Sequence, residues 1–169
     1  MSIITLTTDF GHKDYFVSVS KAALIQEAPA ATIVDISHEI SPFNHTETAY
    51  ILKNAYKSFP KGTVHIVGVD SELSPENNHI VMLFDGHYFI GANNGVFSLI
   101  IEEMKYEKLV EINIHNTLLT TFPVLDVFVK VAGHLSRNGS MDVIGKPLQK
   151  LKEIVGVKPV INDSGTQII

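Results

Sequence analysis

The amino-terminal part of the chain repeats one pattern, in which a short apolar segment ends beside a carboxylate and leads into a segment of helical periodicity. The three apolar segments and their carboxylates are residues 3–8 with Asp9, residues 32–36 with Asp35, and residues 64–69 with Asp70. Short runs rich in β-branched residues are typical of strands buried on both faces. Strands that alternate with helices predict right-handed βαβ units. The chain is therefore expected to form an α/β domain on a mostly parallel sheet.

The rest of the pattern predicts further helices and a β-hairpin. Asp14 is the expected N-cap of the first helix. An Asp-Gly pair at residues 85–86 separates two strand-like runs, which is a strong hairpin signal. The helices are expected at residues 14–28, about 45–59, 96–103 and 125–136, the hairpin strands at 80–84 and 87–90, and a further strand at 109–114. Residues 144–148 have no clear partner in this pattern.

Length, charge and cysteine content restrict the class of protein. A chain of 169 residues that is 45% hydrophobic is long enough for one domain with a real core. It contains no cysteine, which excludes disulfides and thiolate metal sites and fits a reducing cytoplasm. The net charge of -5 and the lack of a Lys/Arg cluster argue against nucleic-acid binding. The sequence also contains no signal peptide and no apolar run long enough for a membrane span, so a cytoplasmic protein is expected.

The three carboxylates are expected to meet at one crevice, because ligands of open α/β sheets bind at the carboxyl ends of the strands. A single aspartate in such a place is often a capping or loop residue, whereas three together indicate that the crevice is used. His12, His38 and His45 lie near the same loops, so a metal-dependent hydrolase with Asp and His ligands is one alternative. The histidines form no closely spaced pair, which weakens that alternative. His65, inside an apolar strand, is interpreted as a core histidine.

The glycine pattern gives no support to nucleotide-phosphate motifs. The first strand is not followed by Gly-x-Gly-x-x-Gly, and no Gly-x-x-x-x-Gly-Lys occurs. Phe43 and Phe122 are candidates for stacking on a flat ring, and both fit equally well as core residues. From the residues alone, the chain is an α/β ligand-binding domain.

Several segments resemble the S-adenosylmethionine hydroxide adenosyltransferase family, whose relatives include the adenosylmethionine-dependent halogenases. Residues 5–11, Thr-Leu-Thr-Thr-Asp-Phe-Gly, resemble the opening signature of the family, and residues 33–40 resemble its Ile-Val-Asp-Ile-Thr-His stretch. Residues 59–65 resemble Phe-Pro-x-Gly-Thr-Val-His, and residues 93–96 resemble Asp-Asn-Gly-Val. Residues 126–128 and 133–135 resemble the later Asp-Ile-Phe and Ala-His-Leu, so the matches follow the family order.

The resemblance implies a Rossmann-like three-layer α/β/α domain over residues 1–155. Residues 156–169 would then be a linker toward a C-terminal β-barrel domain that this chain lacks. Family members form trimers in which the ligand lies between the N-terminal domain of one subunit and the C-terminal domain of its neighbour. The implied ligand is S-adenosylmethionine, bound as a substrate, with no separate cofactor and no metal.

The resemblance also implies individual site residues. Asp9 would hold the ribose hydroxyls, and a carboxylate suits this task because it accepts hydrogen bonds from two adjacent hydroxyls. Asp14 would approach the methionine amine, and Phe43 and Phe122 would line the adenosine pocket. Asn94, from the Asp-Asn-Gly-Val-like segment, completes the predicted substrate-binding set.

The catalytic signature of the family is only partly present. Its hydrolases displace methionine from the ribose C5′ with water or hydroxide, using an Asp, an Arg seven residues later and a His in Thr-Phe-His. Asp70 keeps the Asp, while Asn77 stands in place of the Arg and Pro123 in place of the His. Asn carries no charge and Pro has no titratable side chain, and the sole arginine, Arg137, is expected at the far end of the last helix.

Three hypotheses remain open from the sequence. The first is an S-adenosylmethionine hydrolase with a modified site that includes Asp70 and Asn77. The second is a protein that binds S-adenosylmethionine or adenosine without turnover. The third is the Asp/His metal-dependent hydrolase.

Overall fold

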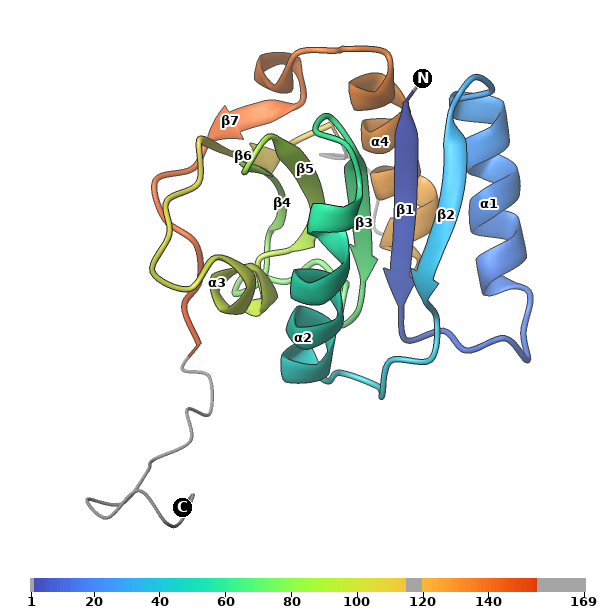
Figure 1. Cartoon of the computed structure of the whole chain (residues 1–169), viewed down its shortest axis with the longest axis horizontal. Coiled ribbons are helices and arrows are strands. Elements are labelled where there is room, and N and C mark those ends of the chain that lie inside the picture. The colour runs from blue at the N-terminus through green and yellow to red at the C-terminus, as the bar shows by residue number, and fades with distance from the viewer. Residues whose placement is uncertain (1, 115–119, 155–169) are drawn as a thin grey trace.

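The domain is built on one seven-stranded sheet. We analysed a computed structural model, which describes residues 2–114 and 120–154 (Figure 1). The strands are β1 (Ile3–Thr8), β2 (Thr32–Ser37), β3 (Val64–Gly68), β4 (His79–Phe84), β5 (His87–Ala92), β6 (Lys108–Ile112) and β7 (Gly145–Pro147). They are ordered β2-β1-β3-β5-β4-β6-β7 in the sheet. The predicted linker at residues 156–169 lies outside the described residues.

The first half of the sheet is parallel, as the repeated pattern predicts. Strand β1 lies between β2 and β3, and β5 continues the parallel set beside β3. The second half starts with the β4–β5 hairpin, which is antiparallel. Its turn is the predicted Asp-Gly pair, and Asp85 and Gly86 both have positive φ, of 50° and 73°. Such a turn matches the twist of the flanking strands.

Helices cover both faces of the sheet, which gives the three layers. The α-helices are α1 (Phe16–Glu27), α2 (His45–Ala55), α3 (Val96–Ile101) and α4 (Val129–Ser136). Helices α1 and α4 enclose one buried cluster with Leu24 and Phe128. Helices α2 and α3 enclose the other, with Leu52 and Phe97. In Figure 1, α2 and α3 lie in front of the sheet and α4 lies behind it. No helix within the described residues is long and apolar enough to cross a membrane.

Residues 144–148, to which the pattern assigned no partner, contain a strand. Gly145–Pro147 forms β7, which pairs with β6 in antiparallel fashion at the edge of the sheet. A Cβ atom on Gly145 would lie 1.7 Å from the backbone oxygen of Glu111, so the chain can approach this closely only with glycine here. A three-residue edge strand is too short to leave a period-two pattern in the sequence.

The helix boundaries differ from the predicted ones in three places. Helix α1 begins at Phe16, and the expected capping role of Asp14 is wrong, because Tyr15 is the N-cap and no side chain caps this helix. Helix α2 is capped by Asn44, whose side chain accepts a hydrogen bond from the Glu47 backbone N–H at 3.0 Å. It ends at Ala55 and continues as a 3-10 turn to residue 58. The last predicted helix opens with a π-helical turn, Val124–Phe128, before α4. The other elements agree with the predicted ranges to within a few residues.

Candidate functional site

Two of the three predicted carboxylates meet where β1 and β3 end. The strands are adjacent and parallel, with Thr8 opposite Gly68, so the residues that follow them leave the sheet side by side. In Figure 1, both strands point to the lower edge of the domain, where the loops that follow β1 and β2 cross. Asp9 and Asp70 are close enough for the charge of Asp70 to act on Asp9. This edge is where ligands of α/β sheets bind.

Asp9 is a half-buried carboxyl group surrounded by backbone donors. Burial raises the pKa of Asp9 above its usual value, and the negative charge of Asp70 adds to this shift. Hydrogen bonds from the backbone N–H groups of Phe43, Asp9 and Asp70 act in the opposite direction. The Phe43 N–H lies 3.2 Å from Asp9 Oδ2. The loop before α2 is thereby tied to the end of β1.

Asp70 is held in place from two sides. Its carboxylate Oδ2 lies 3.0 Å from Nε2 of His45, the first residue of α2. On the backbone side, Nδ2 of Asn94 donates to the carbonyl oxygens of Val69 and Asp70, each at 3.1 Å. The Asn94 side chain also accepts from the Val96 N–H at 3.2 Å, which joins this edge to the start of α3. Both groups of the Asp70–His45 pair are about a quarter exposed, so the pair faces solvent or a ligand.

Two residues at this edge have a backbone conformation that is rare for residues other than glycine. Phe43 has a φ of 60° and Asp70 a φ of 46°, values that L side chains rarely adopt. Residues in such conformations cost free energy and cluster at ligand sites and active sites. The Phe43 ring is 70% exposed, and its backbone is the part of the residue that binds Asp9. Such strain is typical of a ligand site, and the apolar ring of Phe43 is exposed beside it.

Asp35 does not join this crevice, so that part of the prediction is wrong. Its carboxylate pairs with Lys21 of α1 at 2.6 Å and lies 3.1 Å from Nε2 of His38. Burial acts to raise the pKa of Asp35, but the hydrogen bonds from Lys21 and His38 outweigh it and lower the pKa. Asp35 lies inside β2, and its side chain is directed toward α1.

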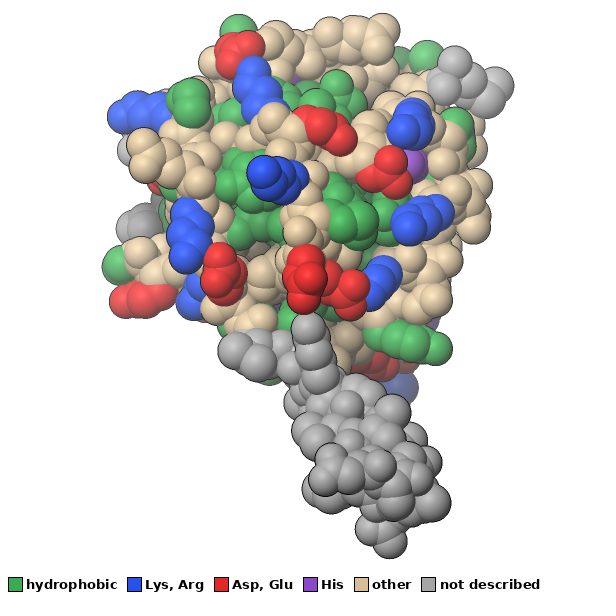
Figure 2. Space-filling model, turned by 60° about the vertical axis from the view of Figure 1, so that its left-hand side comes forward, with side chains coloured by type: hydrophobic (Ala, Val, Ile, Leu, Met, Phe, Trp, Pro, Cys, Tyr) green, Lys and Arg blue, Asp and Glu red, His purple; other side chains and the backbone are tan. Residues whose placement is uncertain are grey.

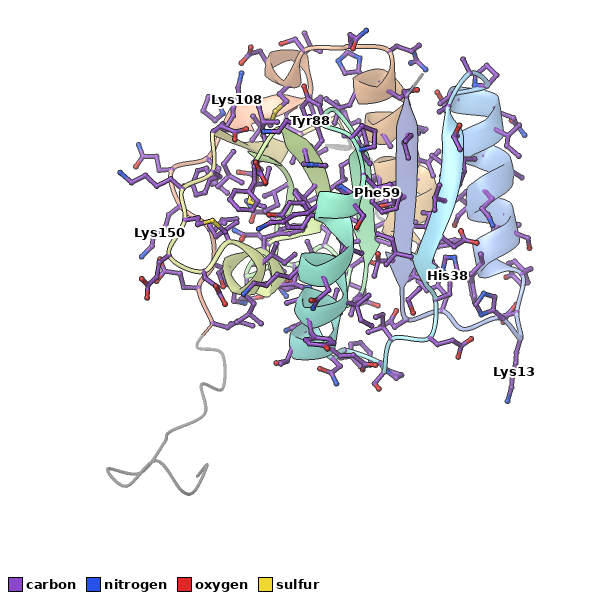
Figure 3. All side chains as sticks on the ribbon, in the orientation of Figure 1. Lys13, His38, Phe59, Tyr88, Lys108 and Lys150 are labelled. Carbon is purple, nitrogen blue, oxygen red and sulfur yellow. The ribbon has the colours of Figure 1, made fainter. Side chains whose placement is uncertain are left out.

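The three histidines of the metal hypothesis do not form one group among the described residues: the ring centroids of His12 and His38 lie 5.2 Å apart, while His45 pairs with Asp70. His12 pairs with Glu39 at 2.6 Å, and His38 is buried with Nδ1 2.7 Å from Thr8 Oγ1. Only His45 contacts an aspartate of the crevice. Figure 3 shows His38 near the end of β2, while the labelled Lys13 projects away from the domain. Across residues 2–114 and 120–154, no three His, Cys, Asp or Glu side chains are grouped so that they could hold a metal ion.

The remaining predicted residues surround this edge less closely. Asp14 is exposed, and its Oδ1 accepts a hydrogen bond from the neighbouring Tyr15 N–H at 2.6 Å. Phe122 is half-buried, with its ring centroid 5.5 Å from that of Phe10 and 5.1 Å from that of Phe16. Pro123, directly after it, is buried at the start of the π-helical turn. π-helical turns occur frequently at functional sites.

Asn77 has a cationic neighbour that the sequence did not predict. Lys152 Nζ donates to Asn77 Oδ1 at 2.7 Å, and the Lys152 backbone N–H donates to Asn93 Oδ1 at 2.9 Å. The segment that carries Lys152 is fixed by the buried side chain of Leu151. A positive charge therefore reaches the loop after Asp70 from a distant part of the chain. No local motif marks Lys152.

Arg137 lies elsewhere, as expected. Its guanidinium donates to the backbone oxygen of Glu27, at the end of α1. The other charges are dispersed: Figure 2 shows lysine side chains interspersed with carboxylates on the face it presents, around apolar side chains. On that face the described residues form no continuous basic surface.

The fold and the site together define a class of protein, an α/β domain with paired carboxylates at the carboxyl edge of a parallel sheet. The model of the SAM hydroxide adenosyltransferase N-terminal domain matches residues 4–145. This chain belongs to the SAM hydroxide adenosyltransferase family.

Its relatives include hydrolases and halogenases. The chain is 32% identical over 160 residues to the (R)-S-adenosyl-L-methionine hydrolase of Methanocaldococcus jannaschii, a match that covers 91% of the chain and 60% of that protein. It is 23% identical to the fluorinase of an Actinoplanes species, over 93% of the chain and 62% of the fluorinase. An uncharacterized conserved protein from Thermotoga maritima has a crystal structure with a TM-score of 0.85 and 33% identity, over 94% of this chain and 63% of that one. The chain thus spans about three fifths of the length of these proteins.

Proposed function

We propose that the protein is an S-adenosylmethionine hydrolase that forms adenosine and methionine. The observation that carries the proposal is the Asp9–Asp70 pair at the carboxyl edge, in a chain of this family. A relative named (R)-S-adenosyl-L-methionine hydrolase, of which 60% is matched, supports the substrate class. No separate cofactor or metal enters the proposal.

In this proposal, the substrate-binding residues surround Asp9. The Asp9 carboxylate accepts hydrogen bonds from the two ribose hydroxyls, and Phe43 and Phe122 contact the adenine. Asp14, exposed on the loop after β1, binds the methionine ammonium group. Asn94 positions Asp70 through the backbone carbonyl oxygens that it binds. The open Phe43 ring accords with a pocket completed by another domain.

In the proposed reaction, Asp70 is the residue nearest to the chemical step. A water molecule attacks C5′ of the ribose, the C5′–S bond breaks, and its electron pair moves to sulfur. Methionine leaves as a neutral thioether, so the leaving group needs no acid, and the protein must position the water and accept its proton. In our proposal, Asp70 lies beside the attacking water. Asn77 and the Lys152 ammonium bound to it contribute polarity to the adjoining loop.

The second candidate function is S-adenosylmethionine or adenosine binding without turnover. The observation that favours it is the pair of residues at the family's Arg and His positions, which are Asn77 and Pro123. Neither can supply the charge or the proton transfer expected there. The metal-dependent hydrolase has no comparable observation in its favour.

Assembly and location remain predictions. We expect a homotrimer when the C-terminal domain is present, a small-molecule nucleoside substrate, and no nucleic-acid or membrane partner. A cytoplasmic location also stays a prediction. Sedimentation equilibrium of the protein would test the trimer.

The test of the two candidate functions uses the natural full-length protein. It is incubated with each sulfonium epimer of S-adenosylmethionine, and adenosine and methionine are separated by chromatography. Calorimetric titration with S-adenosylmethionine and adenosine measures binding in parallel. Product formation supports the hydrolase, and binding without product supports the second function. If neither occurs, both proposals fail.

Asp9→Asn is expected to weaken binding of S-adenosylmethionine by about 10- to 100-fold, because charge-assisted hydrogen bonds contribute about 1.5–3 kcal/mol. The carboxylate form binds the hydroxyls, and burial raises the pKa of Asp9. Affinity of the wild type should therefore fall with acidification at a higher pH than for an ordinary aspartate. Calorimetry between pH 4 and 8 measures both effects. Equal affinities for the variant and the wild type would remove Asp9 from the ribose site.

Lys152→Met is expected to lower kcat/KM by less than about tenfold, because a single intramolecular hydrogen bond contributes about 0.5–1.5 kcal/mol. Methionine has a side chain of similar length and removes both the charge and the hydrogen bond to Asn77. Lys150→Met is the matched control, since Lys150 is exposed and pairs with Glu153 on the same segment. An equal effect of the two substitutions would show that Lys152 has no particular role.

A further inference from the structure

The catalytic edge contains an imidazole that no motif assigns. Nε2 of His45 lies 3.0 Å from Oδ2 of Asp70, across 25 residues of sequence. The imidazole is 23% exposed and the carboxylate 29%. Among the described residues, Nε2 is the nitrogen of this ring that makes a hydrogen bond, and Nδ1 makes none. The pair has the form of a base whose ring is oriented by a carboxylate.

We propose that His45 is the general base of this enzyme and that Asp70 orients its ring. The inference rests on the proposed hydrolase function and deepens it, because it names the group that receives the proton. It assigns a catalytic role to the first residue of α2, while the family's histidine position is occupied by Pro123. The base is thus supplied by a different element of the same edge.

The fold fixes the position of His45 through its neighbours. Asn44 caps α2 with its side chain and holds the first turn, and its backbone oxygen accepts from Thr48 Oγ1 at 2.7 Å. Two residues before His45, the Phe43 N–H is bound to Asp9. His45 is therefore fixed between the proposed ribose anchor and the Asp70 carboxylate. A reacting C5′ bonded to a ribose held by Asp9 would lie on this side of the domain.

In this proposal the proton of the attacking water moves to His45. With a proton on Nε2 donated to Asp70, the lone pair of Nδ1 is available to accept a proton from water. The water oxygen forms the new bond to C5′, and the electron pair of the C5′–S bond moves to sulfur. The products are adenosine, neutral methionine thioether and an imidazolium, whose positive charge the Asp70 carboxylate stabilises. The imidazolium then releases its proton to solvent.

The other described histidines have other partners. Nε2 of His79 lies 2.9 Å from the Ser71 backbone oxygen, and Nδ1 of His87 lies 3.1 Å from Nε2 of His65. His38 and His65 are buried and hydrogen-bonded to threonine hydroxyls of β1. His12 is bound to Glu39, and His134 lies at the end of α4 with Nε2 3.0 Å from the Ser140 oxygen. In the ion pairs of the described residues, His45 is the histidine that joins a carboxylate of the crevice.

The test compares His45→Ala and His45→Gln with the wild type in the full-length protein. General-base removal typically costs 10²- to 10⁴-fold, so His45→Ala should lower kcat about 10²-fold while calorimetric binding of S-adenosylmethionine changes less than about threefold. Added imidazole should raise kcat of His45→Ala at least about tenfold, because it can occupy the space of the missing ring. His45→Gln should remain inactive, since Gln can bind Asp70 but cannot accept the proton.

His134→Ala is the matched control, and it should retain activity and show no response to imidazole. The inference is overturned if His45→Ala keeps activity within threefold of the wild type. It is also overturned if His45→Gln is fully active, or if imidazole restores nothing although binding is normal. If the wild type shows no turnover, the proposed function and this inference both fail. The wild-type assay is carried out first, so this outcome is distinguished from a failure of the His45 inference alone.

Discussion

Asp70→Asn is expected to lower kcat about 10³-fold, an effect of about 4 kcal/mol on the barrier. The amide cannot stabilise an imidazolium on His45, which lies 3.0 Å away, and it also favours the wrong tautomer of the ring. Asparagine is among the residues best tolerated at positive φ, so the substitution should keep the backbone at 46°. The variant therefore removes one charge and leaves the shape of the site.

The measurement is single-turnover formation of adenosine, with calorimetry to show that the substrate still binds. Asp142→Asn is the matched control, because Asp142 is an exposed carboxylate paired with Lys108 on the opposite end of the fold, near β7. The control should retain wild-type turnover. A rate for Asp70→Asn within tenfold of the wild type would exclude Asp70 from the chemistry.

The sequence predicts those site residues whose positions follow from the order of the parallel strands. Asp9 and Asp70 could be placed together because Asp9 directly follows β1 and Asp70 comes two residues after the end of β3, and the ends of parallel strands meet. The same rule placed Asp35 wrongly, because Asp35 lies two residues before the end of β2 and its side chain pairs with Lys21. The rule locates the end of a strand but not the direction of a side chain within it.

The contacts missed by the sequence all join distant segments through side chains. His45 meets Asp70 across 25 residues, and Lys152 meets Asn77 across 75. Neither pair has a periodicity or a spacing that a motif could express. The left-handed backbone of Phe43 is equally hidden, because phenylalanine does not favour that conformation. Such a residue is fixed by its surroundings, here by the hydrogen bond to Asp9.

These contacts change how the two departures from the family pattern are interpreted. From the sequence, Asn77 and Pro123 stand for the loss of a cation and of a titratable ring. In the structure, a lysine ammonium is bound to Asn77 and an imidazole is bound to Asp70. Each type of group that the sequence lacks at the expected position is thus present nearby, on the segment after β7 and on α2. This arrangement favours the hydrolase over the binding protein.

The second large effect is expected from the core and concerns acid stability. His65 on β3 is fully buried, with Nδ1 2.7 Å from Thr5 Oγ1 and Nε2 3.1 Å from Nδ1 of His87. This confirms the interpretation of His65 as a core histidine. Burial, aided by the charge of His87, lowers the pKa of His65 from 6.5 to about 3. Burial also lowers the pKa of His87.

The direction of the pH effect follows from proton binding in the two states. Between pH 6.5 and 3, the His65 ring is protonated in the unfolded chain and neutral in the fold, so acid favours unfolding. The contribution of His65 to the free energy of unfolding is fully present above the pKa of the unfolded chain and is lost progressively as the pH falls below it. At pH 4 the loss from this one group amounts to about 3 kcal/mol, a large fraction of the stability of a typical domain.

Urea denaturation at pH 7 and pH 4 measures this loss, and His65→Gln identifies its source. Gln is polar and can bond to Thr5 but does not titrate, so the variant should be less stable at pH 7 and lose about 3 kcal/mol less than the wild type on acidification. The carboxylates titrate in both proteins. Their effect cancels when the stability lost between pH 7 and pH 4 is compared between the wild type and the variant. Should the variant not fold, the chemical shift of the His65 ring protons between pH 7 and pH 4 provides the same information, because a neutral ring keeps a constant shift. A ring that titrates near pH 6.5 in the folded protein would refute the prediction.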